Sequence, residues 1–192
     1  MKPLKLNETA ECYKYADYAE WDDDNRYELI DGAAYLMSPG PSQMHQRIVG
    51  RLFRQLDDFL RGKTCEAFFA PSDVCLNAAG DRDDSVVQPD LFVVCDKSKL
   101  DGQRCNGAPD MIIEILSPSS ASRDMLLKYN KYLQAGVREY WIADPDTKMI
   151  RTCILNAGKY DTTDYFNHNT DEIAVQVLSG CIIDVKDIFT DV

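Results

Sequence analysis

The chain has 192 residues, of which 45% are hydrophobic and 28% charged, a composition typical of one globular domain. Its formal net charge of −11 at pH 7 argues against high-affinity, non-specific binding to long duplex nucleic acid, because phosphate contacts need Lys and Arg. No apolar run reaches membrane-spanning length and no apolar stretch follows the lysines of residues 1–6, so we expect a cytoplasmic protein without membrane association.

The first predicted element is a β-hairpin over residues 27–37. Its turn is Asp31-Gly32, which lies between two apolar runs and is a strong signal for a two-residue hairpin loop. A helix is predicted next, with Ser42 as its N-cap and its end near Arg61. The apolar residues of this segment gather on one arc at about 100° per residue, so we expect the helix to cover a sheet.

Short strands and a second helix are predicted for the rest of the chain. The strands before this helix are residues 65–69, 73–76, 86–94 and 110–116. The second helix begins within residues 117–120 and ends near Ala135, before Gly136. The strands after it are residues 139–143, 149–155, 173–178 and 181–185. Strands mixed with two helices favour an α/β layer fold.

The seven cysteines are scattered along the chain and form no Cys-x-x-Cys pair. An odd number at irregular spacing predicts neither a disulfide framework nor a zinc site. We therefore expect buried or incidental thiols in a reducing compartment.

Two predicted strands carry a carboxylate beside apolar residues. Asp90 opens one apolar run, and Glu114 shares a strand face with Ile112 and Leu116. Taken singly, a strand-start acid and a buried salt-bridge partner are the simpler interpretations. Burial of a carboxylate is costly unless it is paired or bound to a metal, and together the two acids suggest a site for Mg²⁺ or Mn²⁺.

The second predicted helix carries a lysine at the edge of its apolar arc. Asp124, Lys128 and Tyr132 recur every four residues and so share one stripe. From that edge Lys128 can run its stem along the core and bring its ammonium to a cleft. On the helix alone, an Asp124–Lys128 surface pair is the simpler alternative. Leu126 falls within the apolar arc, whereas Leu127 lies on the polar side and could mark a subunit contact.

Two further polar residues fall on faces that could point inward. Glu28 shares a strand face with Ile30, but alternation alone does not decide whether that face is buried. His45 lies on the apolar arc of the first helix. A core histidine is the commoner outcome there, and a role as proton shuttle at the site is the alternative.

These residues together resemble a known family. Gln88-Pro89-Asp90 followed by Glu114 is similar to the PD-(D/E)xK signature of restriction-endonuclease-like nucleases. A longer ordered series resembles the Uma (Uma-two) family of restriction endonucleases within that superfamily. The series comprises residues 27–32, 37–39, 45, 88–90, 108–110, 114–119, 124, 128, 132, 135–141 and 144–145, and it spans roughly residues 20–146.

The resemblance implies the fold and the activity. The expected fold is a restriction-endonuclease-like α/β fold, with a central mixed β-sheet flanked by helices and extra strands at both ends. Residues 1–192 would form a single domain, with a core of about 20–146 and a β-rich extension over 147–192. The implied activity is metal-dependent hydrolysis of phosphodiester bonds in DNA.

The resemblance also implies a metal site that uses Mg²⁺ or Mn²⁺. Asp90, Glu114 and the backbone carbonyl of Ile115 would hold the ion, and Glu28 would be an additional ligand of the metal or of a water molecule. Such a site is typical of a hard cation, which takes oxygen ligands.

The remaining roles follow from the same resemblance. Lys128 would be catalytic, by orienting the attacking water or stabilising the transition state. It would replace the lysine that usually lies two residues after the glutamate, where this chain has Leu116. The auxiliary residues would be Glu28, His45, Gln88, Asp124 and Tyr132, with Asp124 or Tyr132 positioning Lys128.

Three alternatives stay open at this stage. The chain could be a non-catalytic binding or interaction module that keeps the fold, a phosphodiesterase acting on RNA or a nucleotide, or a homo-oligomer such as a homodimer. If DNA is the partner, the negative charge favours weak or structure-specific binding.

Overall fold

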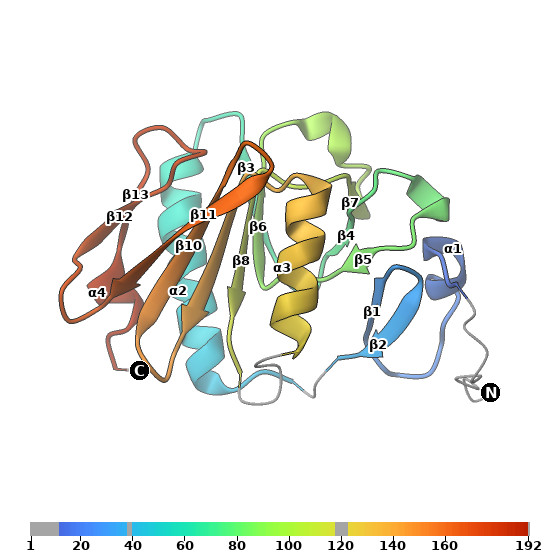
Figure 1. Cartoon of the computed structure of the whole chain (residues 1–192), viewed down its shortest axis with the longest axis horizontal. Helices are drawn as coiled ribbons and strands as arrows, with labels where there is room; N and C mark the ends of the chain where they lie inside the picture. The colour runs from blue at the N-terminus through green and yellow to red at the C-terminus, as the bar shows by residue number, and fades with distance from the viewer. Residues whose placement is uncertain (1–11, 38–39, 118–122, 192) are drawn as a thin grey trace.

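The computed structural model describes residues 12–37, 40–117 and 123–191, with the side chains of the third segment described from residue 126 onward. Its centre is a six-stranded sheet in the order β11-β10-β9-β8-β6-β3 (Figure 1). The strands are β3 (Glu66–Phe69), β6 (Leu91–Val94), β8 (Met111–Ile115), β9 (Glu139–Asp144), β10 (Met149–Asn156) and β11 (Lys159–Phe166). The β8–β9 pair is parallel and the other pairs are antiparallel, which confirms the predicted mixed sheet.

Two helices cover opposite faces of this sheet, α2 (Gln43–Leu60) and α3 (Arg123–Ala135) (Figure 1). Strand alternation divides the buried side chains accordingly: Ile113 packs in the cluster with α2, whereas Ile112 packs in the cluster with α3. Burial on both faces explains why β6 and β8 read as nearly continuous apolar runs.

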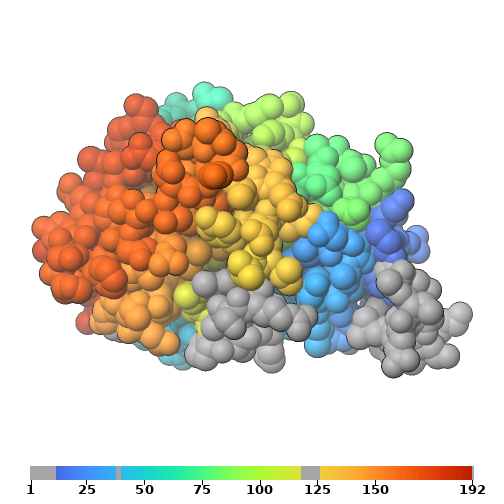
Figure 2. Space-filling view, in the orientation of Figure 1, coloured from blue at the N-terminus to red at the C-terminus, as the bar shows by residue number. Residues whose placement is uncertain are grey.

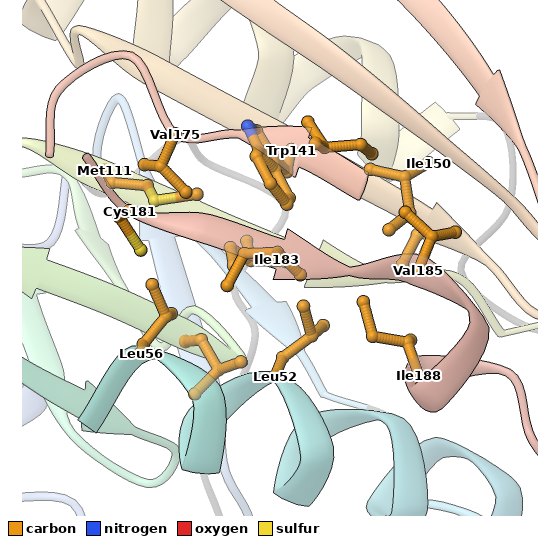
Figure 3. Packing of buried hydrophobic residues seen from close by; sticks show 14 of the residues in the cluster. Leu52, Leu56, Met111, Trp141, Ile150, Val175, Cys181, Ile183, Val185 and Ile188 are labelled. Atoms are coloured by element: carbon orange, nitrogen blue, oxygen red, sulfur yellow. The ribbon is translucent and has the colours of Figure 1, made fainter. Parts of the chain in front are cut away.

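Helix α2 forms as predicted because its cap and its apolar period agree. Ser42 Oγ accepts a hydrogen bond from the His45 amide at 3.2 Å. The residues buried on its inner face are Ile48, Leu52, Leu56 and Leu60. Figure 3 shows Leu52 and Leu56 beside Ile183 and Ile188, so the C-terminal segment helps to close this side of the core.

The apolar face predicted for α3 is confirmed in the second half of the helix and wrong at its start. Tyr132 is fully buried and Tyr129 and Leu133 are partly buried, but Leu126 is 63% exposed and Leu127 is half-buried. Helical periodicity predicts the same buried face for every turn, whereas Leu126, in the first turn of α3, is exposed to solvent. Of the predicted helix start within residues 117–120, Ser117 is not helical and residues 118–120 lie outside the described residues.

A second, five-stranded sheet has the order β2-β1-β5-β4-β7. Its strands are β1 (Tyr27–Ile30), β2 (Ala33–Leu36), β4 (Asp73–Cys75), β5 (Val86–Val87) and β7 (Arg104–Asn106). The predicted hairpin is confirmed: Ile30 pairs with Ala33, and the two turn residues Asp31 and Gly32 have φ of 52° and 76°. Positive φ at both loop positions is the conformation that Asp-Gly adopts readily.

The predicted strand over residues 86–94 is wrong, because two strands in two sheets occupy it. β5 belongs to the five-stranded sheet and β6 to the six-stranded one, and Gln88-Pro89-Asp90 connects them. Pro89 has no N–H to donate, so a ladder cannot run through it. The switch between sheets leaves Asp90 just before β6, where the two sheets meet.

The C-terminal part contains one long strand, β11, that the sequence did not predict. β11 pairs along its whole length with β10 and forms one edge of the six-stranded sheet. The strands predicted at 173–178 and 181–185 are present but shorter: they are β12 (Glu172–Ala174) and β13 (Ile182–Asp184), which pair in a small sheet. The unpredicted helix α4 (Val185–Ile188) follows. The remaining short elements are α1 (Tyr15–Tyr18) and the 3-10 turns η1 (Gly80–Arg82) and η2 (Lys97–Lys99). None of the helices in the described ranges combines the length and apolarity that crossing a membrane requires.

The expectation that all cysteines are thiols is wrong for one pair, because Cys65 and Cys95 form a disulfide. The β3–β6 register pairs Glu66 with Val94, so the next residues outward face each other across the sheet. Their separation of 30 positions in the sequence does not predict this disulfide, because the pairing depends on the strand register. Cys12 is an exposed thiol, and Cys75, Cys105, Cys153 and Cys181 are buried thiols.

Candidate active site

A cleft of about 740 Å³ lies where the two sheets meet. It is lined by the β1–β2 hairpin, the first turns of α2, the chain just before β6, the end of β8 and the turn after β9. The hairpin lies beside α3 along one face of the molecule, blue beside gold (Figure 2). Predicted site residues that line the cleft are Glu28, His45, Gln88, Asp90, Glu114, Ile115 and Lys128.

Asp90 and Glu114 are brought together by the register of β6 and β8. Leu91 pairs with Ile113 in antiparallel strands, so Asp90, which precedes Leu91, lies opposite Glu114, which follows Ile113. The Asp90 amide lies 3.5 Å from Glu114 Oε2, and the Ile115 amide donates to Asp90 Oδ2 at 2.8 Å. The structure therefore gives Ile115 a contact through its N–H, and a role for its carbonyl stays a prediction.

Lys128 points into the cleft and contacts two carboxylates. Its Nζ lies 3.0 Å from Glu114 Oε1 and 2.8 Å from Glu28 Oε1, and the side chain is 14% exposed. Burial lowers the pKa of Lys128, but Glu114 and Glu28 outweigh this and raise it well above its usual range, so the ammonium stays charged. The side chain of Asp124, the predicted partner on the surface, lies outside the described residues.

All four residues of β1 are buried, and Glu28 lines the cleft together with Ile30, which resolves the choice that alternation left open. Its Oε1 accepts the Gln88 amide at 2.9 Å in addition to the Lys128 ammonium. The Gln88 side chain in turn accepts from Arg26 and donates to Tyr18 and to Asp73. Gln88 thus links Glu28 of β1 to α1 and to β4.

Sequence reasoning missed three residues of this network, namely Tyr18, Arg26 and Asp73. They lie 70, 62 and 15 positions from Gln88, and none belongs to a spacing that would have connected them to it. Only the packing of α1, β1 and β4 brings them together.

His45 lines the cleft rather than the core, and its predicted role as a proton shuttle stays a prediction. Its Nε2 lies 3.1 Å from Asp90 Oδ2, and its side chain is 11% exposed. The Ser42 cap starts α2 so that His45 falls in the first turn, next to Asp90. Burial lowers the pKa of His45, but the hydrogen bond and charge of Asp90 outweigh it and raise the pKa above its usual range.

Two tyrosines pack behind the carboxylates. Tyr132 donates from its hydroxyl to Glu114 Oε1 at 2.7 Å, so it holds the glutamate and reaches Lys128 only through their shared oxygen. Tyr140 of β9 lies with its ring centroid 5.0 Å from that of Tyr132. Its buried hydroxyl finds no hydrogen-bond partner among the described residues. Tyr140 belongs to the series of residues that resembles the Uma family, but the sequence analysis predicted no role for it.

The two tyrosines should respond oppositely to loss of the hydroxyl. We expect Tyr132→Phe to lower the free energy of unfolding by about 1.5–3 kcal/mol, because a hydrogen bond to a buried carboxylate is lost. Tyr140→Phe should leave it unchanged or raise it, because an unsatisfied buried hydroxyl is removed. Urea unfolding of both variants measures this difference, and an equal loss in both would show that Tyr140 has a partner.

The charges around the cleft leave a negative excess. Glu28 and Glu114 contact the Lys128 ammonium, and Asp90 lies next to Glu114. When all three carboxylates are ionised and His45 is neutral, the cluster carries two excess negative charges. Burial raises the pKa of Glu114 to about 7; Lys128 opposes this rise, whereas Asp90 and Glu28 add to it. Such a cluster favours a bound cation.

The donor set fits an open hard-cation site. No three His, Cys, Asp or Glu side chains within the described segments converge as a complete metal site. Mg²⁺, however, is commonly bound by one or two carboxylates and completes its shell with water and phosphate oxygens. Two adjacent carboxylates with a main-chain segment beside them, as at Asp90 and Glu114, supply that partial set.

Comparisons with known proteins agree with this architecture. A model of the Uma2 family, described as “Putative restriction endonuclease”, matches residues 15–186. An uncharacterized protein of Synechocystis sp. is 29% identical over 118 residues, which cover 60% of this chain and 60% of that protein. A crystal structure of a “putative nuclease belonging to DUF820” from Anabaena variabilis has a TM-score of 0.72 at 18% identity, covering 93% of this chain and 98% of the other. At this identity the similarity concerns the fold, which is restriction-endonuclease-like.

Proposed function

The chain belongs to the Uma2 family, described as “Putative restriction endonuclease”, and from this premise we propose that it is a metal-dependent endonuclease that hydrolyses phosphodiester bonds in DNA. One observation carries the proposal. Asp90 and Glu114 lie side by side in a cleft, and the Lys128 ammonium lies 3.0 Å from Glu114 although it comes from a different element. Leu116, at the usual place of the lysine, packs in the α3 cluster.

Asp90 and Glu114, with the Ile115 carbonyl, are the residues that would hold Mg²⁺ or Mn²⁺, and Glu28 is an additional candidate. A bound divalent ion would polarise a phosphoryl oxygen and lower the pKa of a bound water. The buried carboxylates need such a counter-charge, which supports the assignment.

The protein residues have separate tasks in this mechanism. Lys128 carries a permanent positive charge at the cleft and stabilises the negative charge that develops on the phosphoryl oxygens. Glu28 holds Lys128 together with Glu114. His45 orients the Asp90 carboxylate, as Tyr132 orients that of Glu114.

Metal-dependent cleavage tests the proposal directly. Purified protein is incubated with plasmid and linear DNA, in Mn²⁺, in Mg²⁺ and in chelator, while Mn²⁺ binding is measured by calorimetry. We expect cleavage with either metal, none in chelator, and saturable Mn²⁺ binding. Mn²⁺ binding without cleavage of any DNA would favour the non-catalytic module, and absence of both would contradict the metal site.

Metal affinity should depend on pH because Glu114 must be deprotonated to bind a metal. Its pKa is raised to about 7, so Mn²⁺ affinity should increase between about pH 6 and about pH 8. His45 loses its proton with rising pH as well, which strengthens metal binding in the same direction. Calorimetry at several pH values measures the slope. His45→Gln should retain most of it, whereas Glu114→Gln should bind Mn²⁺ weakly and lose it.

A further inference from the structure

Few positively charged side chains that could bind phosphates line the cleft. Among the described residues that line it, one is an arginine, Arg26, and one is a lysine, Lys128. Lys128 is already held by two carboxylates, and Arg26 donates to the Gln88 side chain. The segments 38–39 and 118–122, which adjoin the lining in sequence, contain no Lys or Arg. Contacts to the backbone of a duplex are therefore scarce here.

Apolar side chains line the same cleft and are exposed. Phe69 at the end of β3 is 52% exposed and Leu36 at the end of β2 is 64% exposed, and both belong to the lining. The Phe69 ring is held edge-on by Phe53, with centroids 4.8 Å apart. A half-exposed aromatic ring held in place beside a catalytic cleft is a surface on which a flat base can stack.

The size of the cleft also favours a strand over a duplex. Its volume of about 740 Å³ lies within the range of clefts that hold small ligands, roughly 300–1,000 Å³. A duplex presents phosphates outward and hides the faces of its bases, whereas a single strand exposes them. Carboxylates in the lining, such as Asp144 and Asp146, further disfavour close approach of two phosphate backbones.

We propose that the substrate of this site is single-stranded DNA, whose unpaired bases stack on Phe69 and contact Leu36 beside the Asp90–Glu114 pair. This inference rests on the proposed nuclease function and adds the form of the substrate. Affinity comes mainly from base contacts, and the phosphate next to the carboxylates would be held by Lys128, Arg26 and a bound divalent ion.

Binding is measured by fluorescence anisotropy with a short labelled single strand and its duplex, using full-length protein in Ca²⁺ to separate binding from cleavage. We expect the single strand to bind about tenfold more tightly or better. Phe69→Ala should weaken single-strand binding by about fivefold to about 100-fold, and Phe69→Leu by less, because a stacked ring is lost. The affinity for the single strand should fall only gradually as the salt concentration rises, with a slope equivalent to about two phosphate contacts.

The matched control is Phe166→Ala, since Phe166 is also an exposed phenylalanine at a strand end but does not line the cleft. It should leave both affinities unchanged, and thermal melting verifies that each variant is folded. Equal or tighter binding of duplex, or a Phe69→Ala variant that binds single strands like the wild type, would overturn the inference. Mn²⁺-dependent cleavage of duplex would then leave the nuclease function standing. Absence of Mn²⁺ binding and of cleavage of either DNA would instead reject the nuclease function itself.

Discussion

Asp90→Asn is expected to reduce metal-dependent DNA cleavage by about 1,000-fold or more. The substitution removes the charge that a divalent ion needs, while the asparagine carbonyl oxygen can still accept the Ile115 amide that now bonds Asp90 Oδ2 at 2.8 Å. Mn²⁺ affinity should fall together with the rate, and the melting temperature should change little. Initial cleavage rates and calorimetric titration of the same preparations measure both effects.

Asp146→Asn is the matched control for this prediction. Asp146 lines the same cleft but is exposed in the turn after β9, and its contact with Asp144 is made through its own backbone N–H. Its loss should leave the rate and the Mn²⁺ affinity close to those of the wild type. An Asp90→Asn protein that cuts as fast as Asp146→Asn would exclude Asp90 as a metal ligand.

Lys128→Met is expected to lower the free energy of unfolding by about 3–5 kcal/mol at neutral pH. Methionine keeps the apolar stem, but Glu28 and Glu114 are then buried without the ammonium that lies within 3.0 Å of both. Cleavage should be lost as well, because no other lysine lines the cleft within the described residues. Urea unfolding and cleavage assays measure the two losses.

The pH dependence of this variant gives a second test. Burial already raises the pKa of Glu114 to about 7, and Lys128 opposes that rise, so its removal raises the pKa further. A carboxyl with a raised pKa binds more protons in the folded than in the unfolded state, so folding stability falls as pH rises above the unfolded pKa. Lys128→Met should therefore lose stability more steeply than the wild type between about pH 5 and about pH 8.

Lys131→Met separates the loss of a buried ion pair from the loss of any lysine on α3. Lys131 pairs with Asp31, whose side chain is 72% exposed, so solvent screens the interaction. The expected change is about 1 kcal/mol or less. Similar destabilisation in both variants would mean that Lys128 contributes mainly through its stem and not through its charge.

Local patterns were enough to predict much of the fold. Asp31-Gly32 specifies a hairpin because its two residues accept positive φ, and Ser42 specifies the start of α2 because its hydroxyl caps the first turn. The alternation around Glu114 correctly placed Ile112 on one face of β8 and Ile113 on the other. Each of these features depends on residues that are neighbours in the chain.

Patterns that depend on the partner strand were predicted less well. The single strand expected over 86–94 is divided between two sheets at Pro89, and β7 and β11 went unpredicted. The Cys65–Cys95 disulfide follows from the β3–β6 register, which no spacing in the sequence expresses. Register is chosen by the burial of whole faces, so it is a property of the assembled sheets.

The sequence by itself determined the candidate residues of the site, namely two acids in apolar strands and a lysine at the border of a helix. Only the tertiary structure decided that they meet, with Lys128 between Glu114 and Glu28, a residue 100 positions away from it in the numbering of the chain. The physical reason is that the cost of burying a charge is compensated by whichever opposite charge the packing brings near. That neighbour is set by how the two sheets and α3 pack together, which adjacent residues do not encode.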